Sequence, residues 1–312
     1  MKGLVYKSTG SWYQVKSEEG NLYQCRIKGK LRLSGIRSTS PVAVGDRVSF
    51  DLDDEDVGVI HSIDERDNYL VRKSVNLSKQ LHIIGANIDS VFLVITFKNP
   101  ETFTTFIDRF LVSAAAFGIE TVLLFNKIDQ YTEKELGVVK EQEQLYSTIG
   151  YKTVLCSSKT GQGIDDLKCL MKDNTCIFSG HSGVGKSTLI NTVAPELSLK
   201  IGEISEQHGQ GQHTTTFAEM FDLSFGGRII DSPGIRGFGI ADIEKEEIAR
   251  YFKEFFRASE NCKFNNCQHL SEPGCAVKRK IEEGRIANSR YQSYLSMVLE
   301  EEGPYRQDLF AE

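Results

Sequence analysis

The chain has 312 residues, 40% of them hydrophobic and 26% charged, which is typical of a folded protein with two or three domains. Its net charge of −6 argues against nonspecific polyanion binding by the whole surface, although a local basic patch stays possible. The best apolar run, 91–97, is too short to span a bilayer, and the first residues lack the apolar core of a signal peptide. We therefore expect a cytoplasmic protein with no membrane partner.

Residues 1–72 predict a domain of five short strands, at 3–6, 12–16, 23–27, 47–52 and 58–64, separated by glycine and polar turns. This pattern is typical of a small OB-type β-barrel. The segment 26–37 carries basic residues and no acidic one. It is either a nucleic-acid contact or a solvated strand and loop, and charge alone favours the second.

Residues 73–240 change to alternating strands and helices. Strands are predicted at 88–97, 121–125, 153–156, 175–179, 217–223 and 228–230, and helices at 104–117, 133–149, 165–171 and 186–193. This order predicts an α/β domain with a mostly parallel sheet covered on both faces. Residues 241–312 predict a helical domain, with helices at 243–256 and 290–299.

A phosphate-binding loop follows the strand 175–179 and precedes a helix, which is the context that its G-x-x-x-x-G-K-[ST] pattern requires. Its glycines let backbone N–H groups face phosphate oxygens. A lysine adds positive charge at the β- and γ-phosphates, and a serine hydroxyl can ligate Mg²⁺. The residues are Gly180, His181, Ser182, Gly183, Val184, Gly185, Lys186, Ser187 and Thr188.

Two further loops follow strands and indicate that the base is guanine. Asn126, Lys127 and Asp129 come directly after the strand 121–125. The Asp129 carboxylate can accept both donors of guanine, whereas adenine would leave it unpaired, so an ATPase is the weakest alternative. Asn126 can contact the N7/O6 edge, and the Lys127 stem can cover the base. The next strand ends at Ser157, Ser158 and Lys159, where a backbone N–H can meet guanine O6.

Two candidate switch segments complete the set. Asp231 follows a strand and can hold Mg²⁺ through a water, and the Gly234 N–H can meet the γ-phosphate. The segment 207–216 ends in three threonines, of which we expect Thr215 to ligate Mg²⁺, with Thr214 and Thr216 as alternatives.

The attacking water needs a group to orient it. Ras-like enzymes use a glutamine soon after the glycine of the aspartate motif, and this chain has Ile235 there. His213 is the best candidate for that task, and the alternative is a surface histidine without a catalytic part. The catalytic candidates are thus His213, Lys186 and Thr215.

The motif order is unusual, because both base loops precede the phosphate loop and the switches. The same strands can hold the same places when the chain ends move to another surface loop, since packing depends on final neighbours. The sequence therefore predicts a circularly permuted P-loop GTPase domain.

A cluster of cysteines and a histidine lies in the third domain. Cys262, Cys267, His269 and Cys275 offer three thiolates and one imidazole, which suit a closed tetrahedral Zn²⁺ site. Basic residues follow at 278–280 and 285, and they fit an RNA contact or a solvated helix face about equally well. Cys156 and Cys176 lie in apolar runs, where buried packing is their expected role.

These parts together resemble the ribosome small-subunit-dependent GTPase A family, RsgA, also called YjeQ. The resemblance rests on the permuted order, the phosphate loop, the switch motifs, the barrel and the cysteine cluster, and it covers nearly the whole chain. It implies a late assembly factor, stimulated by the small ribosomal subunit, whose barrel and zinc domains contact ribosomal RNA or protein. Arginines are frequent before the threonines in that family, whereas this chain has Gln210 and Gln212.

Two other functions stay open. A signalling GTPase unrelated to ribosomes would explain the nucleotide motifs but not the barrel and the cysteine cluster. A GTP-dependent RNA-binding scaffold with negligible turnover is kept open by Ile235. We expect GTP or GDP, Mg²⁺ and Zn²⁺ as cofactors, no DNA partner, and a monomer.

Overall fold

The computed structural model describes residues 1–27, 41–73, 81–197, 218–231 and 243–299. Its contacts divide the chain into two compact units. Unit 1 comprises 1–102 and 117–238, and unit 2 comprises 103–116 and 239–312. The domain boundaries expected at 72/73 and 240/241 stay a prediction, but the segment 103–116, which contains a helix, groups with the C-terminal unit rather than with the sheet that flanks it in sequence.

The N-terminal strands of unit 1 form the expected barrel. They are β1 (Lys2–Ser8), β2 (Tyr13–Ser17), β3 (Leu22–Ile27), β4 (Arg47–Leu52) and β5 (Gly58–Ile63). The order is β1-β2-β3-β5-β4, and β4 pairs back onto β1, which closes the barrel. Alternate side chains point inward, and the barrel core consists of Val5, Tyr13, Val15, Cys25, Val42, Val48, Phe50 and Ile60.

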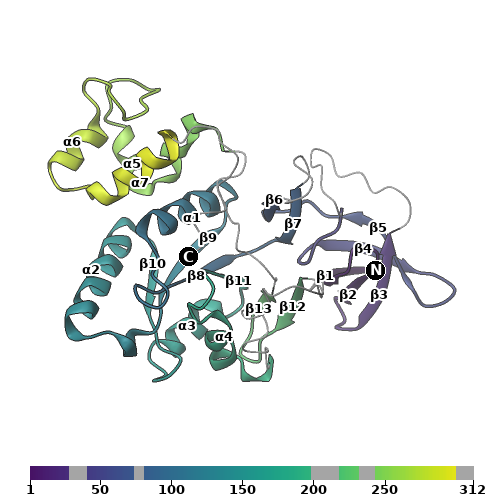
Figure 1. The fold of residues 1–312 in the computed structure, drawn as a ribbon. Coiled ribbons are helices and arrows are strands. Elements are labelled where there is room, and N and C mark those ends of the chain that lie inside the picture. The colour runs from purple at the N-terminus through teal and green to yellow at the C-terminus, as the bar shows by residue number, and fades with distance from the viewer. Residues whose placement is uncertain (28–40, 74–80, 198–217, 232–242, 300–312) are drawn as a thin grey trace, which may run out of the picture. The chain divides into compact units, whose positions relative to one another are not determined.

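The second part of unit 1 is the expected α/β sheet. Its strands are β8 (Ser90–Ile95), β9 (Glu120–Phe125), β10 (Lys152–Leu155), β11 (Thr175–Ser179), β12 (Glu219–Asp222) and β13 (Arg228–Asp231). The order is β10-β9-β8-β11-β13-β12, with only β12 antiparallel. β1 of the barrel pairs with β12, so one sheet runs through both parts (Figure 1). A separate hairpin of β6 (Tyr69–Lys73) and β7 (Leu81–Ala86) was not predicted.

Three helices of unit 1 lie between strands of this sheet in the chain: α2 (Glu133–Ile149), α3 (Ile164–Met171) and α4 (Lys186–Val193). Leucine and isoleucine side chains of α3 and α4 share one buried core with alternate residues of the strands. Short 3₁₀ turns, η1 (Ile128–Gln130) and η2 (Pro195–Leu197), lie between elements. The parallel strands β9, β10, β11 and β13 end at one edge of the sheet, where the predicted nucleotide motifs follow them.

Unit 2 is helical and contains α1 (Thr104–Ala116), η4 (Lys245–Tyr251), α5 (Lys253–Ser259), α6 (Ala276–Glu282) and α7 (Asn288–Leu299). The single helix expected at 243–256 is wrong, because Phe252 is extended between η4 and α5. Its ring is fully buried, lies 4.8 Å from the ring centre of Phe255 and lies under the Arg290 guanidinium. Arg290 is itself buried and pairs with Asp108 of α1 and with Glu254.

Among the residues that the structure describes, none belongs to a helix that is both long enough and apolar enough to cross a membrane.

Candidate functional site

The phosphate loop connects β11 to α4 and takes a shape that only glycine allows at two positions. Gly180 has φ 137°, and a Cβ there would lie 2.4 Å from the Val94 carbonyl oxygen. Gly185 has φ 97°, and a Cβ there would lie 2.7 Å from the Asn126 amide nitrogen. The Lys186 ammonium donates to the carbonyls of Gly180 and His181, both at 2.6 Å, so its charge lies over the loop.

The loop after β9, which carries Asn126, Lys127 and Asp129 and is called the first base loop, contacts the phosphate loop through two side chains. The Asn126 amide donates to the Val184 carbonyl at 2.8 Å, and the Lys127 ammonium donates to the Gly183 carbonyl at 2.7 Å. Lys127 also donates to the Asn99 carbonyl at 2.6 Å, a partner that the sequence did not reveal. Burial lowers the pKa of Lys127, which the nearby Asp129 partly opposes. The loop that would bind the base and the loop that would bind the phosphates are therefore held together by hydrogen bonds.

The loop after β10, which carries Ser157, Ser158 and Lys159 and is called the second base loop, contacts Asp129, the residue that is expected to recognise the base. The Ser157 hydroxyl donates to Asp129 Oδ1 at 2.6 Å and accepts from the N–H groups of Lys159 and Thr160, both at 3.2 Å. Asp129 itself is exposed, so its second carboxylate oxygen and the remaining lone pair of Oδ1 stay available to a base. The Ser158 hydroxyl is buried and has no hydrogen-bond partner within the described part of the chain. Asp129 is therefore held through Oδ1 at an exposed position.

Asp231 ends β13, beside the strand that leads into the phosphate loop. Burial raises the pKa of Asp231, and the facing Glu219 raises it further. A divalent cation at this point would stabilise the charged carboxylate, as a magnesium site requires. His213, Thr215 and Gly234, as well as Thr214 and Thr216, lie outside the described residues, so their roles stay predictions.

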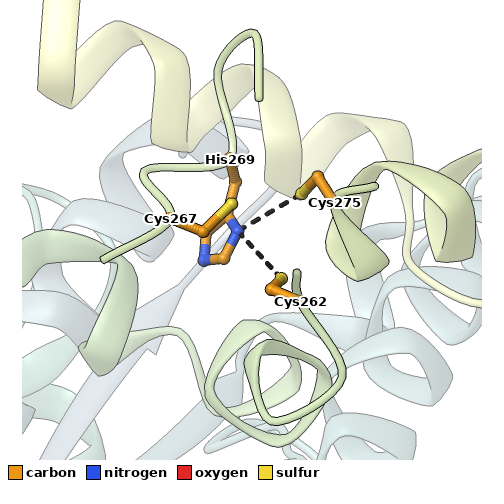
Figure 2. A group of neighbouring side chains, drawn as sticks. All are labelled: Cys262, Cys267, His269 and Cys275. Atoms are coloured by element: carbon orange, nitrogen blue, oxygen red, sulfur yellow. Dashed lines mark hydrogen bonds between the residues drawn. The ribbon is translucent and has the colours of Figure 1, made fainter. Parts of the chain in front are cut away.

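The cysteine cluster of unit 2 brings all four expected ligands together. The ligand atoms of Cys262, Cys267, His269 and Cys275 lie within 4.8 Å of one another. The His269 Nδ1 atom lies 3.8 Å from the Cys262 sulfur and 3.4 Å from the Cys275 sulfur (Figure 2). Tetrahedral zinc with ordinary Zn–S and Zn–N bonds separates such ligand atoms by about 3.6 Å. The cluster therefore fits Zn²⁺ in size as well as in chemistry.

Hydrogen bonds around the cluster hold its ligands in place. The N–H groups of Ala276 and Lys278 point at the sulfurs of Cys262 and Cys275. The Glu272 carboxylate accepts three backbone N–H groups of the turn that carries His269, which also has a positive φ of 58°. Burial raises the pKa of Cys267 to about 12, so zinc must displace protons to bind as a thiolate complex. Glu272 was not recognised from the sequence.

Direct contacts join the base loops to the phosphate loop, and the base loops come first in the chain. These features define a circularly permuted GTPase. Residues 2–60 match the family described as RsgA N-terminal domain, and residues 63–241 match the family described as RsgA GTPase. The chain belongs to the RsgA GTPase family.

Relatives and solved structures agree with this assignment. The small ribosomal subunit biogenesis GTPase RsgA of Christiangramia forsetii is 61% identical and covers 99% of both chains. The protein of that name from Bacteroides fragilis is 55% identical over 98% of this chain and 99% of its own. The crystal structure of YjeQ from Thermotoga maritima has a TM-score of 0.78 and 38% identity, covering 96% of this chain and 97% of its own. YloQ, described as a circularly permuted GTPase, has a TM-score of 0.76 and 30% identity, covering 96% and 93%.

Proposed function

We propose that the protein hydrolyses GTP with Mg²⁺ and acts in the cytoplasm in biogenesis of the small ribosomal subunit. The contacts of Asn126 and Lys127 with the phosphate loop support GTP binding most directly, because they join base recognition to phosphate binding. The names of the curated relatives support the small subunit as the partner. We also propose that the protein is monomeric and binds no DNA.

The proposed chemistry assigns a task to each group. Lys186 stabilises charge at the β- and γ-phosphates, and the hydroxyls of Ser187 and Thr215 ligate Mg²⁺. Asp231 holds the ion through a water, and the Gly234 N–H meets the γ-phosphate. His213 positions the attacking water. Zn²⁺ at the cysteine cluster has a structural role, since four protein ligands leave no open position for catalysis.

Ribosomal RNA is the proposed ligand of the barrel, 1–72, and of the zinc domain, 241–312, which precede and follow the GTPase domain, 73–240, in the sequence. The basic residues after the zinc cluster do not all serve this purpose. Lys278 donates to the Leu270 carbonyl at 3.0 Å and so supports the zinc turn. Arg279 and Arg285 are exposed, although both lie within 4 Å of Glu283. These two arginines are therefore the better candidates for phosphate contacts.

Contacts between the barrel and β12 offer a route by which a bound subunit could influence hydrolysis. β1 pairs with β12, and Lys7 contacts Glu219 at 2.7 Å. The Asp222 carboxylate accepts from the Tyr6 hydroxyl at 2.6 Å and from the Lys16 ammonium at 2.5 Å. Asp222 and Asp231 lie at opposite ends of the hairpin β12–β13. A displacement of the barrel would thus pull on the strand that ends in the proposed magnesium ligand.

Asp222→Ala is expected to weaken stimulation by the small subunit while basal turnover stays unchanged. An exposed ion pair is worth about 0.2–1 kcal/mol, so the expected loss is about 1.4- to fivefold. The measurement is GTP turnover with and without subunits. Lys152→Met is the matched control, because its ion pair with Glu120 at 3.0 Å joins the strands at the far edge of the sheet. Equal stimulation of both variants and the wild type would refute the proposed route.

GTP turnover with purified small subunits present and absent tests the whole proposal. We expect clear stimulation by the subunits and negligible turnover for Lys186→Ala. A GTPase that ignores the subunit and does not co-sediment with it would indicate a signalling protein. Co-sedimentation without measurable turnover would indicate an RNA-binding scaffold instead.

A further inference from the structure

Cys156 follows β10 at the start of the second base loop, and its side chain contacts Asn126 of the first. Its side chain is fully buried, as packing alone would explain, but its sulfur also lies 3.7 Å from the Asn126 side-chain oxygen. That separation is within the range of a hydrogen bond from sulfur. The backbones of the two base loops also meet here, since the Cys156 N–H donates to the carbonyl of Phe125, the residue before Asn126, at 2.9 Å.

The thiol must be the donor in this contact. Burial raises the pKa of Cys156 to about 12, so the S–H stays protonated near neutral pH. An amide oxygen has no hydrogen to donate, and the thiol supplies the hydrogen that it accepts. The amide of Asn126 is therefore oriented with its oxygen toward Cys156 and its nitrogen toward the Val184 carbonyl.

The opposite orientation of the Asn126 amide would break both contacts. It would place the oxygen against the Val184 carbonyl, where two acceptors repel, and would turn the NH₂ group toward the thiol. The amide also has little space, because Asn126 is 3% exposed and a Cβ at Gly185 would lie 2.7 Å from its nitrogen. The orientation of one buried amide thus helps to set the position of the Val184–Gly185 backbone.

We propose that Cys156 is a positioning residue for the nucleotide: its S–H group fixes the Asn126 amide, and that amide holds the phosphate loop at Val184. The proposal rests on the proposed GTP binding. It predicts an effect on nucleotide affinity and on KM, because the residue acts through Asn126 and touches no reacting atom. Turnover at saturating GTP is expected to stay nearly unchanged.

Cys156→Thr and Cys156→Val form the decisive pair, because the two side chains have the same shape and only threonine keeps a donor. We expect Cys156→Thr to bind fluorescent GDP within about twofold of the affinity of the wild type. Cys156→Val is expected to bind it about three- to tenfold more weakly, the effect of one buried hydrogen bond, with KM for GTP raised by the same factor. Cys176→Val is the matched control for burial.

Cys176 lies in the same buried core as Cys156, but its sulfur contacts the carbonyls of Met171 and Asn174. Loss of that thiol is expected to lower the melting temperature without changing GDP affinity. A double-mutant cycle adds a further check, since Cys156→Val should have no effect on GDP affinity in an Asn126→Ala background.

Equal GDP affinity of the Cys156 Thr and Val variants would overturn the proposal, as would full additivity in the cycle. An equal loss of affinity in Cys176→Val would also overturn it, because it would assign the effect to core packing. Failure of the wild type to bind GDP would contradict the proposed function itself, and the wild-type titration therefore separates the two failures.

Discussion

Asp129→Asn is expected to change the preferred nucleotide from guanosine to xanthosine diphosphate. Guanine presents two donors to the carboxylate, whereas xanthine has an oxygen in place of the amino group. An asparagine offers one acceptor and one donor, which match xanthine and leave an unfavourable contact with guanine. Because a mismatched polar pair that the bound base buries costs about 1–3 kcal/mol on each side, GDP affinity should fall by about 30-fold or more.

The structure explains which way the new amide would face. The Ser157 hydroxyl donates to Asp129 Oδ1. An asparagine at this position would keep its oxygen there, where it can accept from both the Ser157 hydroxyl and the N1–H of the base, so its NH₂ group would meet the xanthine oxygen. Competition of xanthosine and guanosine diphosphates for the purified protein measures the change. Asp165→Asn, at the exposed start of α3, is the control that should keep guanosine preference. A variant at 129 that still prefers GDP would contradict the base-reading role.

The elements that carry the nucleotide motifs could be predicted because each motif is local. A buried strand, a turn with the required residues and a helix follow one another within about 20 residues, as from β11 to α4. The five barrel strands were found in the same way, from short alternating runs between turns. The hairpin of β6 and β7 was missed, although its two strands pair with each other in a separate two-stranded sheet.

Contacts between distant parts of the chain could not be predicted from local patterns. The support of Asp129 by Ser157 joins residues 28 positions apart, and it depends on the parallel register of β9 and β10. The pair of Arg290 with Asp108 spans 182 positions, and it places α1 with the C-terminal helices. Phe252 interrupts a well-patterned helix because its burial against Phe255 and Arg290 outweighs helical propensity.

Loss of the zinc site is expected to unfold unit 2 while nucleotide binding persists. Structural zinc contributes apparent binding energies of about 10–16 kcal/mol at neutral pH, comparable to the whole stability of a small domain. The buried cluster of unit 2 includes Cys275 and packs against Cys262 and Cys267, so the metal ligands are part of its core. The described contacts of the nucleotide motifs all lie within unit 1.

Cys275→Ser tests this expectation with little other disturbance. Cys275 accepts the Lys278 N–H at the start of α6, and serine is a favourable residue at that N-cap, so the cap can persist while the ligand is lost. We expect one zinc per chain in the wild type and none in the variant. The variant should also show rapid proteolysis after residue 240 and a fall of more than about 10 °C in the melting temperature of unit 2. Cys169→Ser, at an exposed thiol of α3, is the control and should change none of these. A Cys275→Ser protein that keeps its zinc, or that loses it and still resists protease, would show that the cluster does not hold unit 2 together.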